Sequence, residues 1–424
     1  MEIKANRLSE NMISMLGLKG LEYVLNFALL PILLRVLGPE RFGAYAFMQG
    51  IIQYFIIITD YGFNMTAPRD IAKSVNNSQK VADIFCNVMV AKFILCCSFT
   101  MISVIFAIFS GLAYKLDIVL FFATYAMVVG NIIFPIWFFQ GIQQMRYITI
   151  VNIAARFLMV AAVLFFVKGP EDYLLAAFLQ SSVTVVAGIF SFGIIFKKYS
   201  FVLTNFHSLR LKETLKEGWS IFVSTIAINI YTTTTIVILG VLTSNIIVGY
   251  YSAANKVLDS IRGIMNTITQ TIYPHVAKMI SEQKPQVFLF LRHFFYMYVG
   301  GCAFGGVILF FLAWLVVKIL FGPGYEPSIN ILKILAFVPF AVAISNVYGV
   351  QCLLNFGYQK TFSNILVLGA TFNLLIVGVL IYFFQAIGAA LSMLLTESGV
   401  AIASIYYVKK IHTIDFMCKR NGWE

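Results

Sequence analysis

Charged residues are scarce in this sequence of 424 residues. Asp, Glu, Lys and Arg together make up 11% of it, whereas hydrophobic residues make up 60%. An ordinary globular domain carries roughly a quarter charged residues. So few charges cannot cover a molecule of this size in water, and most of its surface must therefore face another medium.

The sequence also lacks the motifs of common enzyme and cofactor sites. It has no GxxxxGKS or GxxxxGKT loop for nucleotide phosphates and no HExxH pair for zinc, and its six cysteines show no metal-ligand spacing. We therefore expect neither a metal nor a cofactor. The stretches between apolar runs are short, the longest being 197–217. Because none of them has room for a soluble catalytic domain, an enzyme is disfavoured.

Long apolar runs are what the sequence has in abundance. Residues 43–59, 88–113, 118–139 and 299–317 carry almost no charge. About 20 apolar residues cross a hydrocarbon core of roughly 30 Å as a helix. The runs are continuous and do not alternate with polar residues, which favours membrane-spanning helices over the strands of a membrane barrel.

The apolar runs predict an all-α polytopic membrane protein with about twelve spans. The expected spans are 11–36, 42–64, 81–110, 117–139, 148–167, 174–196, 218–242, 247–276, 291–318, 328–352, 362–384 and 386–408.

The basic residues are distributed unevenly between the two sides of the predicted membrane. An even number of spans places both termini on one side, and most of the 30 Lys and Arg residues lie in or at the edges of the links on that side. The other side has only Arg41, Lys115, Lys168 and Lys318. The positive-inside rule then predicts cytoplasmic termini. The net charge of +12 is explained by this topology, so a nucleic-acid partner is not needed.

The second and eighth predicted spans match at one fixed offset of 206 residues. Gly43 falls on Gly249 and Pro68 on Pro274, with polar residues matching in between. This repeat predicts two pseudo-symmetric lobes of six helices, residues 1–210 and residues 211–424, around a central cavity. Duplicated halves around a central site are typical of secondary transporters.

A polar stripe follows one face of the predicted helix 247–276. At 100° per residue, the members of the stripe fall within about 100° of one another. They are Tyr251, Asn255, Asp259, Arg262, Asn266, Gln270 and Tyr273. Two interpretations stay open, since polar residues can hold membrane helices together or can line a water-filled cavity.

Charged residues at mid-membrane depth are the candidate site residues. Such charges are costly in lipid and usually have a partner or line a cavity. Cations suit an anionic substrate, and carboxylates suit coupling to H⁺ or Na⁺. The candidate substrate-binding residues are Arg156, Lys256, Arg262, Asn255, Lys19 and Lys92. The candidate ion-coupling residues are Asp259, Glu397, Asp60 and Glu22.

Structural ion pairs are the alternative for several of these residues. Lys19 with Glu22, and Asp259 with Lys256 or Arg262, have the three-residue spacing of intrahelical pairs. In contrast, Lys92, Arg156 and Glu397 have no oppositely charged residue one helical turn away. Each of these three therefore needs a partner from another helix, from water or from a substrate.

Short motifs along nearly the whole chain resemble the bacterial O-antigen flippases of the Wzx type. Each motif is weak alone, but their order and spacing together are fairly specific. They include Leu37-Gly38-Pro39, Asp60-Tyr61-Gly62-Phe63-Asn64, Pro135-Ile136-Trp137-Phe138-Phe139-Gln140-Gly141, Ala253-Ala254-Asn255 and Gly322-Pro323-Gly324-Tyr325. The resemblance implies the fold of the multidrug/oligosaccharidyl-lipid/polysaccharide exporter superfamily. It also implies an undecaprenyl-pyrophosphate-linked oligosaccharide as substrate.

The sequence and the resemblance together predict a flippase that works by alternating access in the bacterial inner membrane. Membrane lipid and the lipid-linked oligosaccharide are its expected partners, and the polysaccharide polymerase machinery is a further candidate. Two alternatives stay open: a multidrug and toxin extrusion antiporter, and a membrane glycosyltransferase or polymerase. Loss of a flippase should trap lipid-linked units on the cytoplasmic side, whereas loss of a polymerase should still display single units outside.

Overall fold

A computed structural model of the chain describes residues 2–109, 117–198, 233–284 and 286–411. It also describes Leu215, Gly218, Trp219, Phe222, Ile226, Asn229 and Met417. Of residues 2–27, 106–109 and 198 only the backbone is described. The elements in this part of the chain are all helices.

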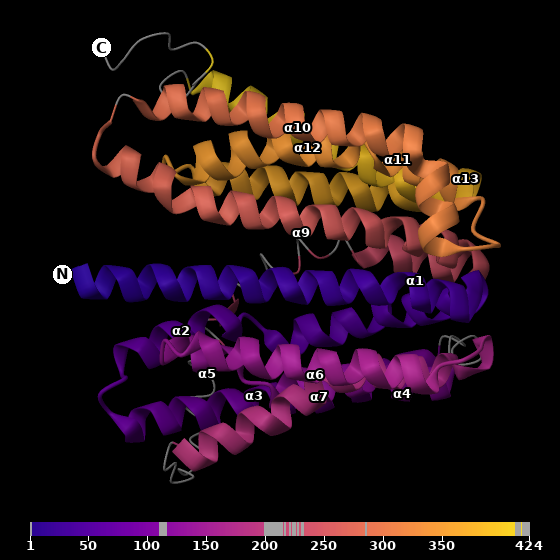
Figure 1. Ribbon diagram of the computed structural model, residues 1–424, viewed down its shortest axis with the longest axis horizontal. Helices are drawn as coiled ribbons and strands as arrows, with labels where there is room; N and C mark the ends of the chain where they lie inside the picture. The colour runs from indigo at the N-terminus through magenta and orange to yellow at the C-terminus, as the bar shows by residue number, and fades with distance from the viewer. Residues whose placement is uncertain are drawn as a thin grey trace. The chain divides into compact units, whose positions relative to one another are not determined.

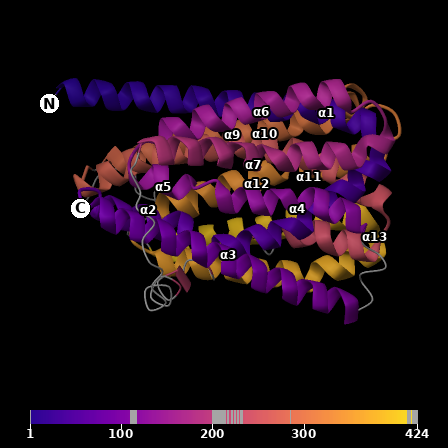
Figure 2. The ribbon, with the colours of Figure 1, turned by 90° about the horizontal axis from the view of Figure 1, so that it is seen from below.

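The chain folds into two compact units, each made of helices that run lengthwise beside one another (Figures 1 and 2). Unit 1 comprises residues 1–37 and 47–226, and unit 2 comprises residues 38–46 and 227–424. The predicted lobe boundary at residue 210 lies outside the described residues and stays a prediction.

Unit 1 contains most of α1 and the helices that follow it, with α7 packed against both α4 and α6. Its elements are α1 (Glu2–Asp60), α2 (Phe63–Lys73), α3 (Ser78–Phe109), α4 (Ile118–Ile133), α5 (Ile136–Gly141), α6 (Met145–Phe166), the 3₁₀ turn η2 (Pro170–Asp172) and α7 (Tyr173–Lys198).

Unit 2 is built around α13, which packs against α9, α11 and α12. Its elements are α9 (Asn245–Ser281), α10 (Gln286–Val316), the π-helical turn η3 (Val317–Phe321), α11 (Ser328–Leu335), α12 (Val338–Ser345), the π-helix η4 (Asn346–Leu354) and α13 (Gln359–Lys410).

Single backbone kinks divide the two longest helices. Gly38 interrupts α1 with a φ of 69°, and Gln385 interrupts α13 with a φ of 50°. These positions lie between the predicted spans 11–36 and 42–64, and between 362–384 and 386–408. Each long helix therefore contains two of the expected spans.

Eight helical segments of the described chain are long and apolar enough to cross a membrane, and the segments holding α1 and α13 are among them. Helix α9 is not one of the eight, although it is 37 residues long. Lys256, Asp259 and Arg262 crowd its middle turns. Part of the predicted span 218–242 lies outside the described residues, and only its end, Thr233–Leu242, is described as a continuous helix.

Two glycines explain why the short segment 38–46 belongs to unit 2. A Cβ atom on Gly43 would collide with the carbonyl oxygen of Asn245, and one on Gly249 would collide with that of Pro39. Only glycine allows so close an approach of two backbones. The two glycines that match in the sequence repeat thus pack this segment against the start of α9.

Candidate functional site

The polar face of α9 is anchored at one end by Tyr251 and Asn255, both of which are buried. The Tyr251 hydroxyl lies 3.7 Å from the Met393 sulfur on α13, and Asn255 Nδ2 donates to Asp259 Oδ2 at 3.2 Å. One amide group therefore orients the carboxylate of Asp259 within the same helix.

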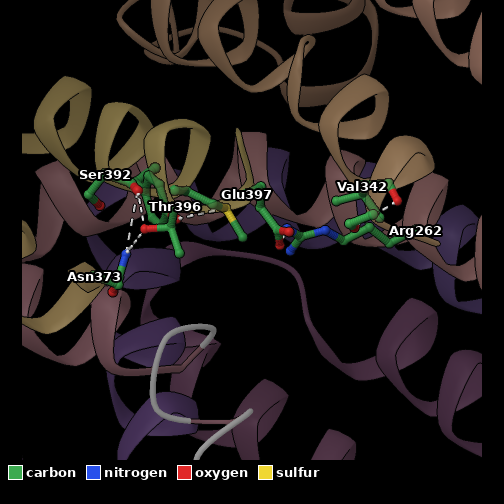
Figure 3. A network of polar contacts seen from close by, with 9 residues as sticks. Arg262, Val342, Asn373, Ser392, Thr396 and Glu397 are labelled. Atoms are coloured by element: carbon green, nitrogen blue, oxygen red, sulfur yellow. Dashed lines mark hydrogen bonds and ion pairs between the residues drawn. The ribbon is translucent and has the colours of Figure 1, made fainter. Parts of the chain in front are cut away.

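An ion pair between two helices forms the centre of the site in unit 2. Arg262 Nη2 on α9 lies 2.9 Å from Glu397 Oε1 on α13, and the two side chains point at each other in Figure 3. Their side chains are only 16% and 9% exposed. Removing two charges from water is expensive, so breaking such a pair by deleting one partner is strongly unfavourable. Glu397 is expected from the sequence to need a partner from another helix, from water or from a substrate, and Arg262 on α9 is a partner of the first kind.

A chain of hydrogen bonds holds the helical segment that carries Glu397. Asn373 Nδ2 donates to Thr396 Oγ1 at 2.9 Å, and Thr396 Oγ1 donates to the Ser392 carbonyl at 2.7 Å (Figure 3). Asn373 lies before the kink at Gln385, whereas Ser392 and Thr396 lie after it. These bonds join the two halves of α13 and fix the position of the neighbouring Glu397.

A second buried ion pair lies in unit 1. Lys92 Nζ on α3 lies 2.7 Å from Asp60 Oδ1 at the end of α1, with side-chain exposures of 1% and 21%. Lys92 Nζ also donates to Asn131 Oδ1 on α4 at 3.4 Å. Lys92 is expected from the sequence to need a partner from another helix, from water or from a substrate, and Asp60 and Asn131 are partners from two other helices.

A neutral polar cluster in unit 2 centres on Tyr298. Tyr298 on α10 lies 206 residues after Lys92, the offset of the sequence repeat. Its hydroxyl accepts from Asn346 Nδ2 at 3.3 Å and donates to the Met265 carbonyl at 3.3 Å. Sequence reasoning missed Asn131, Tyr298 and Asn346. The available signal was a lone polar residue within an apolar span.

The remaining candidate residues are placed less centrally. Arg156 on α6 donates from Nε to Asn152 Oδ1 at 3.4 Å and has at least one further interaction. Lys256 is exposed on α9. The side chains of Lys19 and Glu22 lie outside the described residues, so their predicted roles stay predictions.

The described candidates therefore form two separate charged groups, Asp60 with Lys92 in unit 1 and Asp259, Arg262 and Glu397 in unit 2. Both groups lie in helices that are otherwise largely apolar. Each pair can exchange its internal partner for an external charge, since a proton or cation neutralises the carboxylate and an anion satisfies the base. Within the described residues, no group of His, Cys, Asp and Glu could hold a metal ion.

Solved structures with the same architecture define the class of fold. The chain is similar to an inward-facing multidrug resistance MATE family transporter of the MOP superfamily, with a TM-score of 0.70, 13% identity and coverage of 94% of this chain and 96% of that one. It is also similar to the lipid II flippase MurJ, with a TM-score of 0.67, 13% identity and coverage of 94% and 87%. The prediction of a polytopic all-α protein with about twelve membrane helices in two lobes is thereby confirmed.

Sequence relatives then give the family. The model of the family described as "Polysaccharide biosynthesis protein" matches residues 8–280, and the chain belongs to this family. It is 34% identical over 415 residues to a protein of Escherichia coli (strain K12) named "Putative O-antigen transporter", covering 96% of this chain and 98% of the relative. A Shigella dysenteriae protein of the same name is 26% identical, with coverage of 95% and 100%. The resemblance to O-antigen flippases is thus confirmed.

Proposed function

We propose that this protein moves lipid-linked oligosaccharide units of the O-antigen type across the bacterial inner membrane, from the cytoplasmic to the periplasmic leaflet. The names of the two sequence relatives and the fold shared with a lipid II flippase support this function. The carrier is proposed to be undecaprenyl pyrophosphate, and both termini are proposed to lie in the cytoplasm. The protein acts as a transporter in lipopolysaccharide biosynthesis and catalyses no bond change.

The observation that carries this proposal is the Arg262–Glu397 pair on the polar face of α9. The planar guanidinium of Arg262 has five N–H donors and binds phosphate oxygens two at a time. A proton or Na⁺ on Glu397 cancels the charge that holds Arg262. Arg262 is then free for the pyrophosphate of the headgroup, and release of the headgroup restores the internal pair.

Coupling of lipid movement to an ion gradient follows from this exchange. Headgroup and carboxylate compete for one guanidinium, so binding of the ion to Glu397 favours binding of the headgroup to Arg262, and the empty site returns to the internal ion pair. Asp259 lies one helical turn before Arg262 and is the second candidate for the coupling ion. Arg156 and Lys92 are the candidate headgroup contacts in unit 1.

Deletion of the gene tests the proposed function directly. Surface polysaccharide should be lost, lipid-linked repeat units should accumulate on the cytoplasmic side, and restoring the gene should reverse both effects. Single repeat units still displayed outside would indicate a polymerase. Intact surface glycan with altered drug tolerance would indicate a multidrug antiporter.

A reporter that is active only in the periplasm tests the proposed topology. Fused after Glu424, the reporter should stay inactive. Activity there would contradict the cytoplasmic placement of the termini.

A further inference from the structure

An apolar cavity lies within unit 2, away from the ion pairs described above. Its volume is about 570 Å³, and all its lining residues come from α9, α10 and the segment Ala336–Pro339. This volume falls within the range of about 300–1,000 Å³ that small-molecule sites usually have. The walls include Ile264, Ile268, Met297 and Tyr298. Ile264 is 62% exposed and Met297 is 78% exposed, so the cavity is open along its rim.

The cavity is lined by α9 and α10, which contact each other, over several turns of each helix. Its α10 wall extends from Phe294 to Leu309, roughly 22 Å at a rise of 1.5 Å per residue. Two stacked rings belong to this wall, Phe294 and Tyr298, with a centroid distance of 5.0 Å. Such a groove fits a long hydrocarbon chain better than it fits a compact solute.

Two glycines leave space in the groove that a side chain would otherwise fill. Gly301 and Gly305 line the cavity, and a Cβ atom on either would meet no atom within 4 Å. Gly306 is different, because a Cβ there would lie 2.6 Å from the Ala336 carbonyl oxygen. Gly306 therefore serves helix packing, whereas Gly301 and Gly305 keep the groove open.

One end of the groove carries a positive charge. Lys278 in the last turn of α9 and Lys284 in the link to α10 lie 3.8 Å and 2.5 Å from the single carboxylate of Glu282. Lys284 beside Glu282 holds the pKa of that carboxyl below its usual range, so Glu282 is ionised at neutral pH. Arg292 adds another cation two residues before Phe294. The end of the groove therefore has an excess of positive charge, which suits an anionic headgroup.

We propose that this groove binds the prenyl chain of the anionic carrier lipid, with the phosphates of the lipid at the basic end formed by Lys278 and Arg292. This inference rests on the proposed function, which makes an anionic prenyl lipid the substrate. The groove holds the tail while the headgroup is taken up, so the lipid is selected by its chain as well as by its sugar.

Photocrosslinking in vesicles tests the occupant of the groove. The full-length protein carries a benzophenone amino acid in place of Met297, and the vesicles contain phosphatidylethanolamine and phosphatidylglycerol with a small fraction of undecaprenyl pyrophosphate. Mass spectrometry identifies the adduct. Prenyl lipid enriched well above its mole fraction is the expected result. Adducts that follow the bulk lipid composition would overturn the proposal.

Two matched glycine substitutions test whether the open space in the groove is needed for prenyl-lipid binding. Gly305→Leu fills the groove and should lower the prenyl adduct about tenfold, the factor that 1.4 kcal/mol represents. Gly300→Leu is the control, because Gly300 is equally open, with no atom within 4 Å of a Cβ, but does not line the cavity. Equal adduct yields from the two variants at equal protein level would contradict the assignment.

The headgroup end is tested with Arg292→Gln and two probe lipids. Crosslinking of undecaprenyl pyrophosphate should fall about tenfold or more, as expected on losing one charge-assisted contact, whereas crosslinking of uncharged undecaprenol should not change. A deletion strain that keeps its surface glycan would reject the proposed function. Export that depends on the protein, together with adducts of phospholipid alone, would reject only the groove.

Discussion

Each unit has a polar cluster between its helices, but the two clusters differ in chemistry. In unit 1 the cluster is charged, with Lys92 bonded to Asp60 and Asn131. At the offset of 206, Lys92 corresponds to Tyr298 and Asp60 to Asn266, both of which are neutral. These two positions therefore carry charge in unit 1 and none in unit 2.

The ion pair of unit 2 lies at another position of the repeat. Arg262 corresponds at the same offset to Ile56 of unit 1, a buried apolar residue. The Arg262–Glu397 pair therefore has no charged equivalent on α1. This difference indicates that the two ion pairs have separate tasks, and the following variants test that separation.

The largest effect is expected from breaking the pair in unit 1. Lys92→Met leaves the Asp60 carboxylate without its cation in a setting where Lys92 is 1% exposed. Loss of one partner of a buried pair costs about 3–5 kcal/mol, so the thermal midpoint of the purified protein in detergent should fall sharply. The double variant Lys92→Met with Asp60→Asn removes both charges, as in unit 2, and should recover most of the loss. A double variant no more stable than the single one would show that the charge itself is needed.

Substitution of Arg262 should reduce export strongly while leaving unit 1 intact. Arg262→Gln removes a charge-assisted contact worth roughly 1.5–3 kcal/mol, so surface glycan export should fall about tenfold or more at equal protein level. Arg262→Lys keeps the positive charge and should retain part of the export. The double variant Arg262→Gln with Glu397→Gln distinguishes a role of the pair in export from a purely structural role. Normal export by this double variant would make the pair purely structural.

A smaller effect is expected at the neutral cluster. Tyr298→Phe removes the hydroxyl that accepts from Asn346 and donates to the Met265 carbonyl. Lost neutral hydrogen bonds are worth about 1 kcal/mol each, so the thermal midpoint should fall less than for Lys92→Met. Equal losses for the two variants would remove the distinction between a charged and a neutral cluster.

The smallest effect is expected at Lys256. This residue is exposed on α9, and exposed charges contribute about 0–1 kcal/mol to an ion pair. Lys256→Gln should therefore change export by less than about threefold in the glycan assay. A loss as large as that of Arg262→Gln would place Lys256 in the headgroup site.

The helices were accessible to prediction because each can be recognised from local sequence. Lipid allows no unpaired backbone groups, so an apolar run of sufficient length becomes a helix regardless of its neighbours. The kink at Gly38 lies in the predicted link between the first two spans. The kink at Gln385 lies between the last two predicted spans.

The partners of the buried charges were not accessible in the same way. The spacing allowed Arg262 to pair with Asp259 on its own helix, yet Arg262 forms its ion pair with Glu397, 135 residues further along the chain. Likewise Asn131 and Tyr298 had no pattern that separated them from ordinary polar residues in a span. Contacts between helices depend on which faces meet, and that information is spread over several distant segments.

The sequence by itself determined the medium, the number and approximate limits of the spans, and the repeat, because hydropathy and periodicity are properties of single segments. Only the tertiary structure decided that Lys92 meets Asp60, that Arg262 meets Glu397, and that Gly301 and Gly305 open a groove between α9 and α10. The physical reason is that burial of a charge, and the space beside a glycine, are set by the side chains that neighbouring helices bring to the same place.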